Sequence, residues 1–97
     1  MADAERTRYI AECFWAGVRE QDLRDLEVRI DAAAAATLGG HEPPVRYLGW
    51  LLVLDDEVVL ILFEGPPGSV RRVARDAGIP YERLLNASHA LRPDQIN

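Results

Sequence analysis

Two neighbouring segments of the chain, residues 45–54 (VRYLGWLLVL) and 58–63 (VVLILF), are almost entirely apolar, and an acidic stretch, residues 55–57, joins them. A strand with one face in water alternates apolar and polar residues, whereas most positions of both parities are apolar here. The pattern therefore predicts a β-hairpin that needs cover on both faces. A chain of 97 residues with two helices covers one face of such a sheet well. We expect the other face to meet a partner subunit, a ligand, or both.

Length and composition predict one domain, residues 1–97, with its core at about residues 8–91. Apolar residues make up 48% of the chain and charged residues 28%, as in an ordinary globular protein. The acids at 55–57 would be costly inside a bilayer, so we expect no membrane partner. The first residues lack the basic-then-apolar order of a secretory signal, which predicts a cytoplasmic location.

The formal charge is −5, and the eleven basic residues are all arginine. An acidic chain without a basic cluster is a poor partner for nucleic acid, because binding to nucleic acid depends on neutralising phosphates. A single cysteine, Cys13, excludes an intrachain disulfide and a metal knuckle of the CxxC type. The chain has no glycine-rich phosphate loop, and we expect no organic cofactor.

The elements expected along the chain are strand, helix, strand, strand, helix, strand. The first strand is residues 8–15 and the first helix spans about residues 20–38. The second helix spans residues 70–77 with Ser69 as its N-cap, and the last strand lies within residues 83–91. This order predicts an α+β, ferredoxin-like βαββαβ sandwich: a four-stranded antiparallel sheet with both helices on one face. We expect a homodimer through the open sheet face, with a cavity between the two sheets.

Four short motifs are similar to those of the small bacterial domains of the DUF4242 family. They are Ala11-Glu12, Ala16-Gly17-Val18, Val45-Arg46-Tyr47-Leu48 and Leu62-Phe63-Glu64. The resemblance covers roughly residues 8–85, with Ala16 where the family usually has proline and a bulky Trp50 at a position that is often smaller. It implies a homodimeric ferredoxin-like sandwich, and a described member of the family binds nickel.

Glu12 is the one polar residue between Ile10 and Phe14. A core covered by helices tolerates an unpaired carboxylate badly, so this face of the first strand is expected to be the open one. An arginine would neutralise Glu12 in a structural pair, and without one its pKa would be raised, as in a functional carboxylate. The expected pocket has apolar walls and few polar groups, as is common for small-molecule sites. Its expected residues are Phe14, Arg46, Leu48, Trp50, Leu60 and Leu62, with Glu64 at one end.

The candidate proton-transfer residues are Glu12, Glu64 and His89, and the candidate metal ligands are His41, His89 and Glu12. The sequence does not fix which residues of the last strand point to the open face. Two alternatives remain: either His89 lies there, or Asn86 and Ser88 do. Cys13 shares its parity with the expected helix side and is interpreted as buried and inert.

Two functions follow from these observations. The first is a small dimeric protein that binds a small molecule, or nickel or another divalent metal, between its sheets. The second is an enzyme without an organic cofactor, of the cyclase, isomerase or oxygenase type, that acts on a hydrophobic small molecule in the same cavity.

Overall fold

Four strands and two helices follow one another in the predicted order within residues 7–87, the part of the chain that the structure, a computed structural model, describes. All three strand pairings are antiparallel, and the sheet order is β2-β3-β1-β4. The ferredoxin-like fold predicted from the sequence is confirmed. The elements are β1 (Arg8–Phe14), α1 (Glu20–Ala35), β2 (Arg46–Val53), β3 (Val58–Glu64), α2 (Pro67–Asp76) and β4 (Arg83–Ala87).

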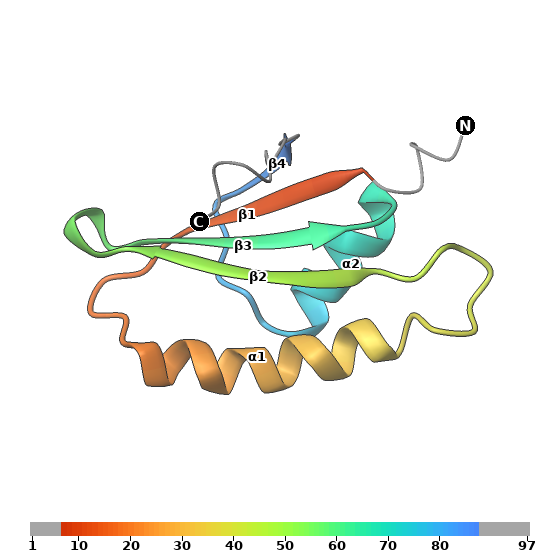
Figure 1. Cartoon of the computed structure of the whole chain (residues 1–97), viewed down its shortest axis with the longest axis horizontal. Coiled ribbons are helices and arrows are strands. Elements are labelled where there is room, and N and C mark those ends of the chain that lie inside the picture. The colour runs from red at the N-terminus through yellow and green to blue at the C-terminus, as the bar shows by residue number, and fades with distance from the viewer. Residues whose placement is uncertain (1–6, 88–97) are drawn as a thin grey trace, which may run out of the picture.

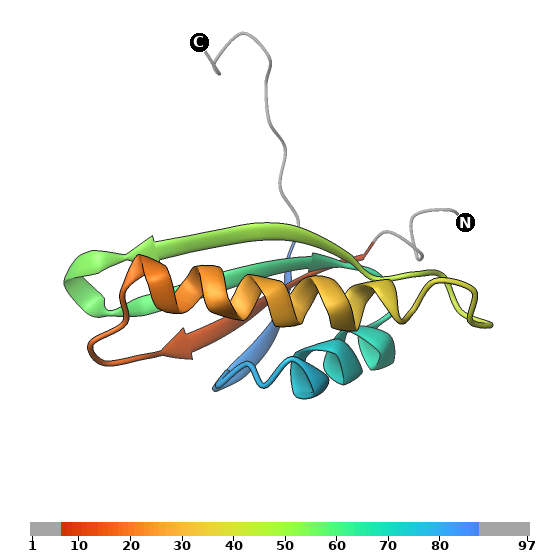
Figure 2. The same ribbon diagram turned by 90° about the horizontal axis from the view of Figure 1, so that it is seen from below.

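Both helices cover the same face of the sheet. In Figure 1 α1 lies below the strands and α2 lies partly behind β2 and β3; in Figure 2, seen from below, α1 runs along the sheet and α2 lies beside it. Neither helix of residues 7–87 is long and apolar enough to cross a membrane. The fold therefore has two layers, one of helices and one of strands, and leaves one sheet face without cover from the described residues.

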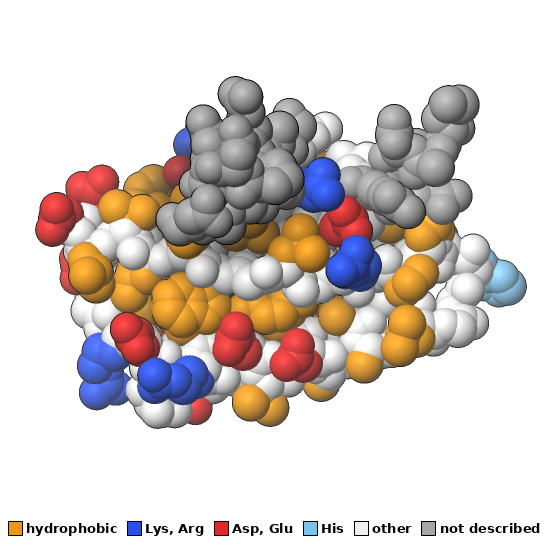
Figure 3. All heavy atoms as spheres, in the orientation of Figure 1, with side chains coloured by type: hydrophobic (Ala, Val, Ile, Leu, Met, Phe, Trp, Pro, Cys, Tyr) orange, Lys and Arg blue, Asp and Glu red, His pale blue; other side chains and the backbone are white. Residues whose placement is uncertain are grey.

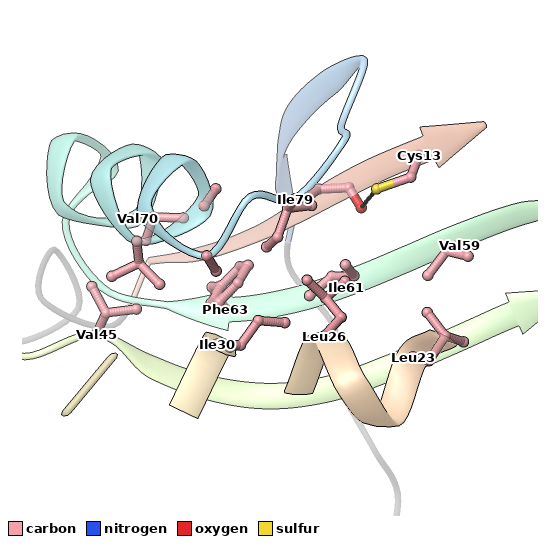
Figure 4. Packing of buried hydrophobic residues seen from close by; sticks show 14 residues of the cluster. Cys13, Leu23, Leu26, Ile30, Val45, Val59, Ile61, Phe63, Val70 and Ile79 are labelled. Atoms are coloured by element: carbon pink, nitrogen blue, oxygen red, sulfur yellow. Dashed lines mark hydrogen bonds between the residues drawn. The ribbon is translucent and has the colours of Figure 1, made fainter. Parts of the chain in front are cut away.

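The core lies between these two layers, where one side of the sheet meets one stripe of each helix (Figure 4). In α1 the buried residues recur at helical spacing, because three or four residues complete one turn. In β1 and β3 the buried apolar residues alternate with more exposed ones, because successive side chains of a strand point to opposite faces. The largest fully buried side chains are Phe63, Leu23, Leu26, Ile30, Ile61, Val59, Val70, Val73 and Cys13.

The second helix begins earlier than the sequence predicts. Pro67 is its first residue, and Pro66 is the N-cap. Proline suits the first helical position because its fixed φ is helical and its missing N–H would have no partner there. Ser69 is therefore not the N-cap; it lies in the first turn, and its hydroxyl donates a hydrogen bond to Glu42 at 2.6 Å.

The first helix ends at Ala35 rather than near Leu38. The hydroxyl of Thr37 donates a hydrogen bond to the carbonyl of Ala34 at 2.6 Å and accepts one from the N–H of Val45 at 3.0 Å. These bonds tie the end of α1 to the entry of β2, so the chain leaves the helical path there. β1 ends at Phe14, and the predicted end of the last strand, residues 88–91, lies outside the described residues.

Candidate functional site

The sheet surface opposite the helices, called the open face below, carries side chains from all four strands. Cross-strand neighbours share a face, so the register assigns each residue to one side. In β1 and β3 the observed alternation is the one that the sequence predicts. The open face consists of Arg8, Ile10, Glu12, Phe14, Arg46, Gly49, Leu51, Val53, Val58, Leu60, Leu62, Glu64, Arg83, Leu85 and Ala87.

The prediction that Trp50 lies on the open face is wrong. A β-bulge between Tyr47 and Gly49 adds one residue to β2, and one extra residue reverses the faces of all that follow. Trp50 therefore lies opposite the buried Ile61 and packs against the core. Gly49, at φ 131°, adopts a backbone conformation that side chains disfavour, and Leu51 replaces Trp50 on the open face.

The same bulge also affects the predicted pocket residue Leu48 and its neighbour Leu52. Leu48 lies within the bulge and is exposed, and Leu52 turns to the core with Trp50. In β4, Arg83 and Leu85 face the open side, so Asn86 has the opposite parity. Ser88 and the candidate His89 lie outside the described residues. The predicted residues that do share the open face are Phe14, Arg46, Leu60, Leu62, Glu12 and Glu64.

One end of the open face is apolar and exposed. Phe14 is 58% exposed and Leu51 is 59% exposed, and Val53 extends the same surface. Val58 lies between Phe14 and Val53 in the register, so the patch is continuous across three strands. Figure 3 shows hydrophobic side chains gathered over β2. Monomeric proteins rarely leave a large continuous apolar patch in water, so this end indicates a surface that makes contacts.

The other end of the open face is charged. Glu64 lies between Arg8 and Arg46 in the register of three strands. An Oε atom of Glu64 is 3.1 Å from Nη1 of Arg46, and the other Oε is 3.3 Å from Nη2 of Arg8. The Glu64 side chain is only 7% exposed, whereas that of Arg46 is 70% exposed. The carboxylate is thus held by two guanidinium groups, one of which reaches into solvent.

Glu12 also has an arginine partner. The Nε–H of Arg83, on the neighbouring strand, donates a hydrogen bond to Glu12 at 2.7 Å. This contact with the carboxylate raises the pKa of Arg83. The structural Glu–Arg pair, which the sequence offered as one alternative for Glu12, is the arrangement found. Its partner is Arg83, which cross-strand register brings beside it from 71 residues away.

Two of the three candidate metal ligands, Glu12 and His41, are among the described residues, and they lie at opposite ends of the strands. Glu12 lies on the open face near the end of β1 that leads to α1. His41 is exposed in the loop between α1 and β2, at the helix layer and the opposite end of the strands. Residues 7–87 contain no group of three or more His, Cys, Asp or Glu side chains that could hold a metal ion. The described residues therefore do not fit a divalent metal.

A pocket of about 400 Å³ on the helix side, with both polar and apolar lining residues, was not predicted from the sequence. The loop after α1 folds against the first turn of α2, where Glu42 accepts the hydrogen bond from Ser69. His41, Arg72 and Asp76 also line this pocket. Glu42 and Ser69 are 27 residues apart in the chain, so no local sequence pattern could have predicted their contact.

Cys13 is fully buried on the helix side, as predicted. Burial raises the pKa of its thiol to about 11, and the nearby carboxylates of Glu82 and Glu12 add to the effect. A thiol that stays protonated at neutral pH is a poor nucleophile. The sulfur points towards the carbonyl of Ala11, as the dashed line in Figure 4 shows.

Comparison with solved structures finds a similar fold. The chain is similar to the crystal structure of SCO4226 from Streptomyces coelicolor A3(2), with a TM-score of 0.70 and 15% sequence identity. The similarity covers 87% of this chain and 99% of that one. No model of a known protein family matches the chain, and no curated protein matches it. At this identity the likeness shows the fold alone, and it agrees with the ferredoxin-like topology described above.

Proposed function

We propose that the protein is a cytoplasmic homodimer that binds a small molecule between two facing sheets. The observation that carries this proposal is the exposed apolar end of the open face, at Phe14, Leu51 and Val53. These side chains lie opposite the helices, so no described element of the same chain covers them. Burial of apolar surface is the main driving force of protein association, and a second copy of the chain supplies an apolar surface of matching extent.

The size of the face favours a second copy over a smaller partner. Four strands at a spacing of about 4.8 Å and seven residues at about 3.3 Å give a projected area of roughly 450 Å² per protomer. Two such faces together approach the lower end of the range for specific interfaces, about 1,000–1,200 Å². A single added strand would cover one edge of the sheet and leave most of the patch in water.

The β-bulge supports a space for a ligand between the sheets. Gly49 occupies the β2 position beside Leu62 and contributes no side chain. The rows of side chains on both sides of Gly49 are larger. If two sheets pack face to face through those rows, a gap remains between the sheets at Gly49. Half-buried Ile10 and Leu62 would form apolar walls there, with Arg46 at one end. Apolar walls with few polar groups are typical of small-molecule sites.

Membership of the DUF4242 family is part of the same proposal. Three of the motif residues that carry the resemblance take part in contacts that build the open face or its turns, namely Glu12, Gly17 and Glu64. Nickel rests on the resemblance alone, since the described residues offer no ligand set. Calorimetric titration with nickel, cobalt and zinc tests it, and no heat with any of them removes the metal from the proposal.

The enzyme alternative receives less support from the geometry. Both oxygens of Glu64 and one oxygen of Glu12 are engaged by arginines, and a candidate general base must reach the proton that it accepts. No described contact favours catalysis over binding. We therefore keep binding as the proposed function.

A pair of matched substitutions tests the dimer. Leu51→Glu places a charge on the open face, and Val28→Glu places the same charge at a 70% exposed apolar position of α1. We expect sedimentation velocity at micromolar concentration to show a dimer for the parent and for Val28→Glu, and a folded monomer for Leu51→Glu. A parent that sediments as a monomer, or equal behaviour of the two variants, contradicts the proposed interface.

A further inference from the structure

We propose that the ligand of the open face is an amphipathic monoanion, an aliphatic carboxylate whose head binds at Arg46 and Arg8 and whose apolar body lies along Ile10 and Leu62. This inference rests on the proposed function and specifies the chemistry of the ligand. Three observations support it: the net positive charge at the Glu64 end of the open face, the unused N–H donors of the two arginines there, and the apolar side chains in the next row of the sheet.

Among the residues that the structure describes, the charged end of the open face has one more cation than anion. Arg8 and Arg46 contribute two positive charges and Glu64 contributes one negative charge, which leaves a surplus of one. The chain as a whole carries −5. Apart from the Glu12–Arg83 pair, whose charges cancel, the other described residues of the open face are uncharged, so the surplus positive charge at this end attracts an anion. One surplus charge matches a monoanion such as a carboxylate better than a doubly charged phosphate.

The two guanidinium groups also have donors to spare. An arginine offers five N–H donors, and each of these residues gives Glu64 one short contact. The Nε of Arg8 is buried without a hydrogen-bond partner among the described residues, so a ligand would reach Arg8 through the exposed part of its side chain, which is 36% exposed. Arg46 is 70% exposed, so its remaining donors reach solvent. Glu64 acts as a positioning residue that holds both guanidinium groups at the same end of the face.

Apolar side chains begin in the next row of the sheet. Ile10 and Leu62 are cross-strand neighbours, two residues along their strands from Arg8 and Glu64, and Leu60 extends the surface along β3. Two residues of a strand span about 7 Å, which is the length of several methylene groups. A ligand that lies along the strands therefore meets charge at its head and apolar side chains along its body.

Three probes separate the contributions of head and body. Decanoate carries both, decanol has the same chain without the charge, and acetate has the charge without the chain. We expect calorimetry at pH 7 to show the tightest binding for decanoate, weaker binding for decanol, and no measurable binding for acetate. Equal affinities for decanoate and decanol overturn the role of the arginines.

Arg46→Gln removes the exposed cation, and Arg71→Gln removes an exposed arginine from α2 as a matched control. A hydrogen bond to a charged group contributes enough that decanoate should bind Arg46→Gln about tenfold more weakly. We expect Arg71→Gln to stay within about twofold of the parent, and Arg46→Lys, which keeps the charge, to lose less than Arg46→Gln. Equal affinity of Arg46→Gln and Arg71→Gln for decanoate overturns the inference.

Sedimentation of the same samples distinguishes this inference from the proposed function. A dimer that binds no decanoate overturns the ligand class and leaves the interface standing. A monomer that prefers decanoate over decanol, and loses the preference in Arg46→Gln, overturns the dimer and supports the ligand class on the open face.

Discussion

The carboxylate of Glu57 accepts a hydrogen bond from the backbone N–H of Gly17, 2.8 Å away and 40 residues earlier in the chain. The carbonyl of Glu57 also accepts a bond from the N–H of Trp15 at 2.9 Å. One residue of the acidic hairpin turn thus fastens the turn between β1 and α1. Glu57 has a left-handed backbone with φ 54°, which aims both groups at that turn.

Glu57→Ala should lower the free energy of unfolding by about 0.5–1 kcal/mol, because it removes a hydrogen bond at an exposed site. Glu57→Gln keeps an acceptor oxygen and the same left-handed backbone, so its loss should be smaller. Urea unfolding of both variants at one fixed protein concentration measures the difference. A loss for Glu57→Gln as large as for Glu57→Ala would mean that the side chain acts through its charge alone.

Gly49→Ala should destabilise the fold by about 1–3 kcal/mol, because φ 131° is strained for any residue with a side chain. Gly68→Ala is the matched control. It lies in α2 with open space around its Cβ position and should stabilise the protein by about 0.5–1 kcal/mol through the better helix propensity of alanine. Thermal unfolding distinguishes the two opposite signs. A neutral Gly49→Ala would mean that the bulge tolerates another conformation.

Tyr47→Phe should cost about 1–2 kcal/mol at pH 7. The phenol of Tyr47 donates a 2.5 Å hydrogen bond to Glu27, and the ring contact with Phe63, at 5.9 Å between centroids, survives the substitution. Glu27→Gln and the double variant complete a cycle that isolates the pair from the other contacts. Additive losses in that cycle would contradict a direct interaction between the two side chains.

Protein stability should fall as the pH rises from 9 to 11, with a contribution from Cys13. The pKa of its thiol is 9.0 in ordinary surroundings and about 11 in the fold. Between these values the unfolded chain has lost the thiol proton and the native protein still holds it, so a higher pH favours unfolding. The expected contribution is about 2 kcal/mol by pH 11.

Cys13→Ala should lack this contribution. Its stability at neutral pH will change because a buried side chain becomes smaller, so the quantity to compare is the slope between pH 9 and 11. Tyr47, whose pKa is also raised, contributes equally to both proteins in that range. Parallel slopes for parent and variant would show that the thiol does not titrate differently in the two states.

Local patterns were sufficient to predict most elements of the fold. Leu23, Leu26 and Ile30 recur at helical spacing, and they form the buried stripe of α1. Glu12 lies between Ile10 and Phe14 on one face of β1, and that face does point away from the helices, as the sequence predicts. Helix ends were predicted less well, because Thr37 ends α1 through a hydrogen bond to Val45, eight residues away.

The sequence by itself determined the order of elements and the two faces of β1 and β3, because periods of two and 3.6 residues are local properties of the chain. Only the tertiary structure decided the face of Trp50, since one extra residue at the bulge reverses the alternation without changing the apolar character of β2. It also decided the partners of Glu12 and Glu64. Those pairs form through cross-strand register, which brings residues together from distant parts of the chain.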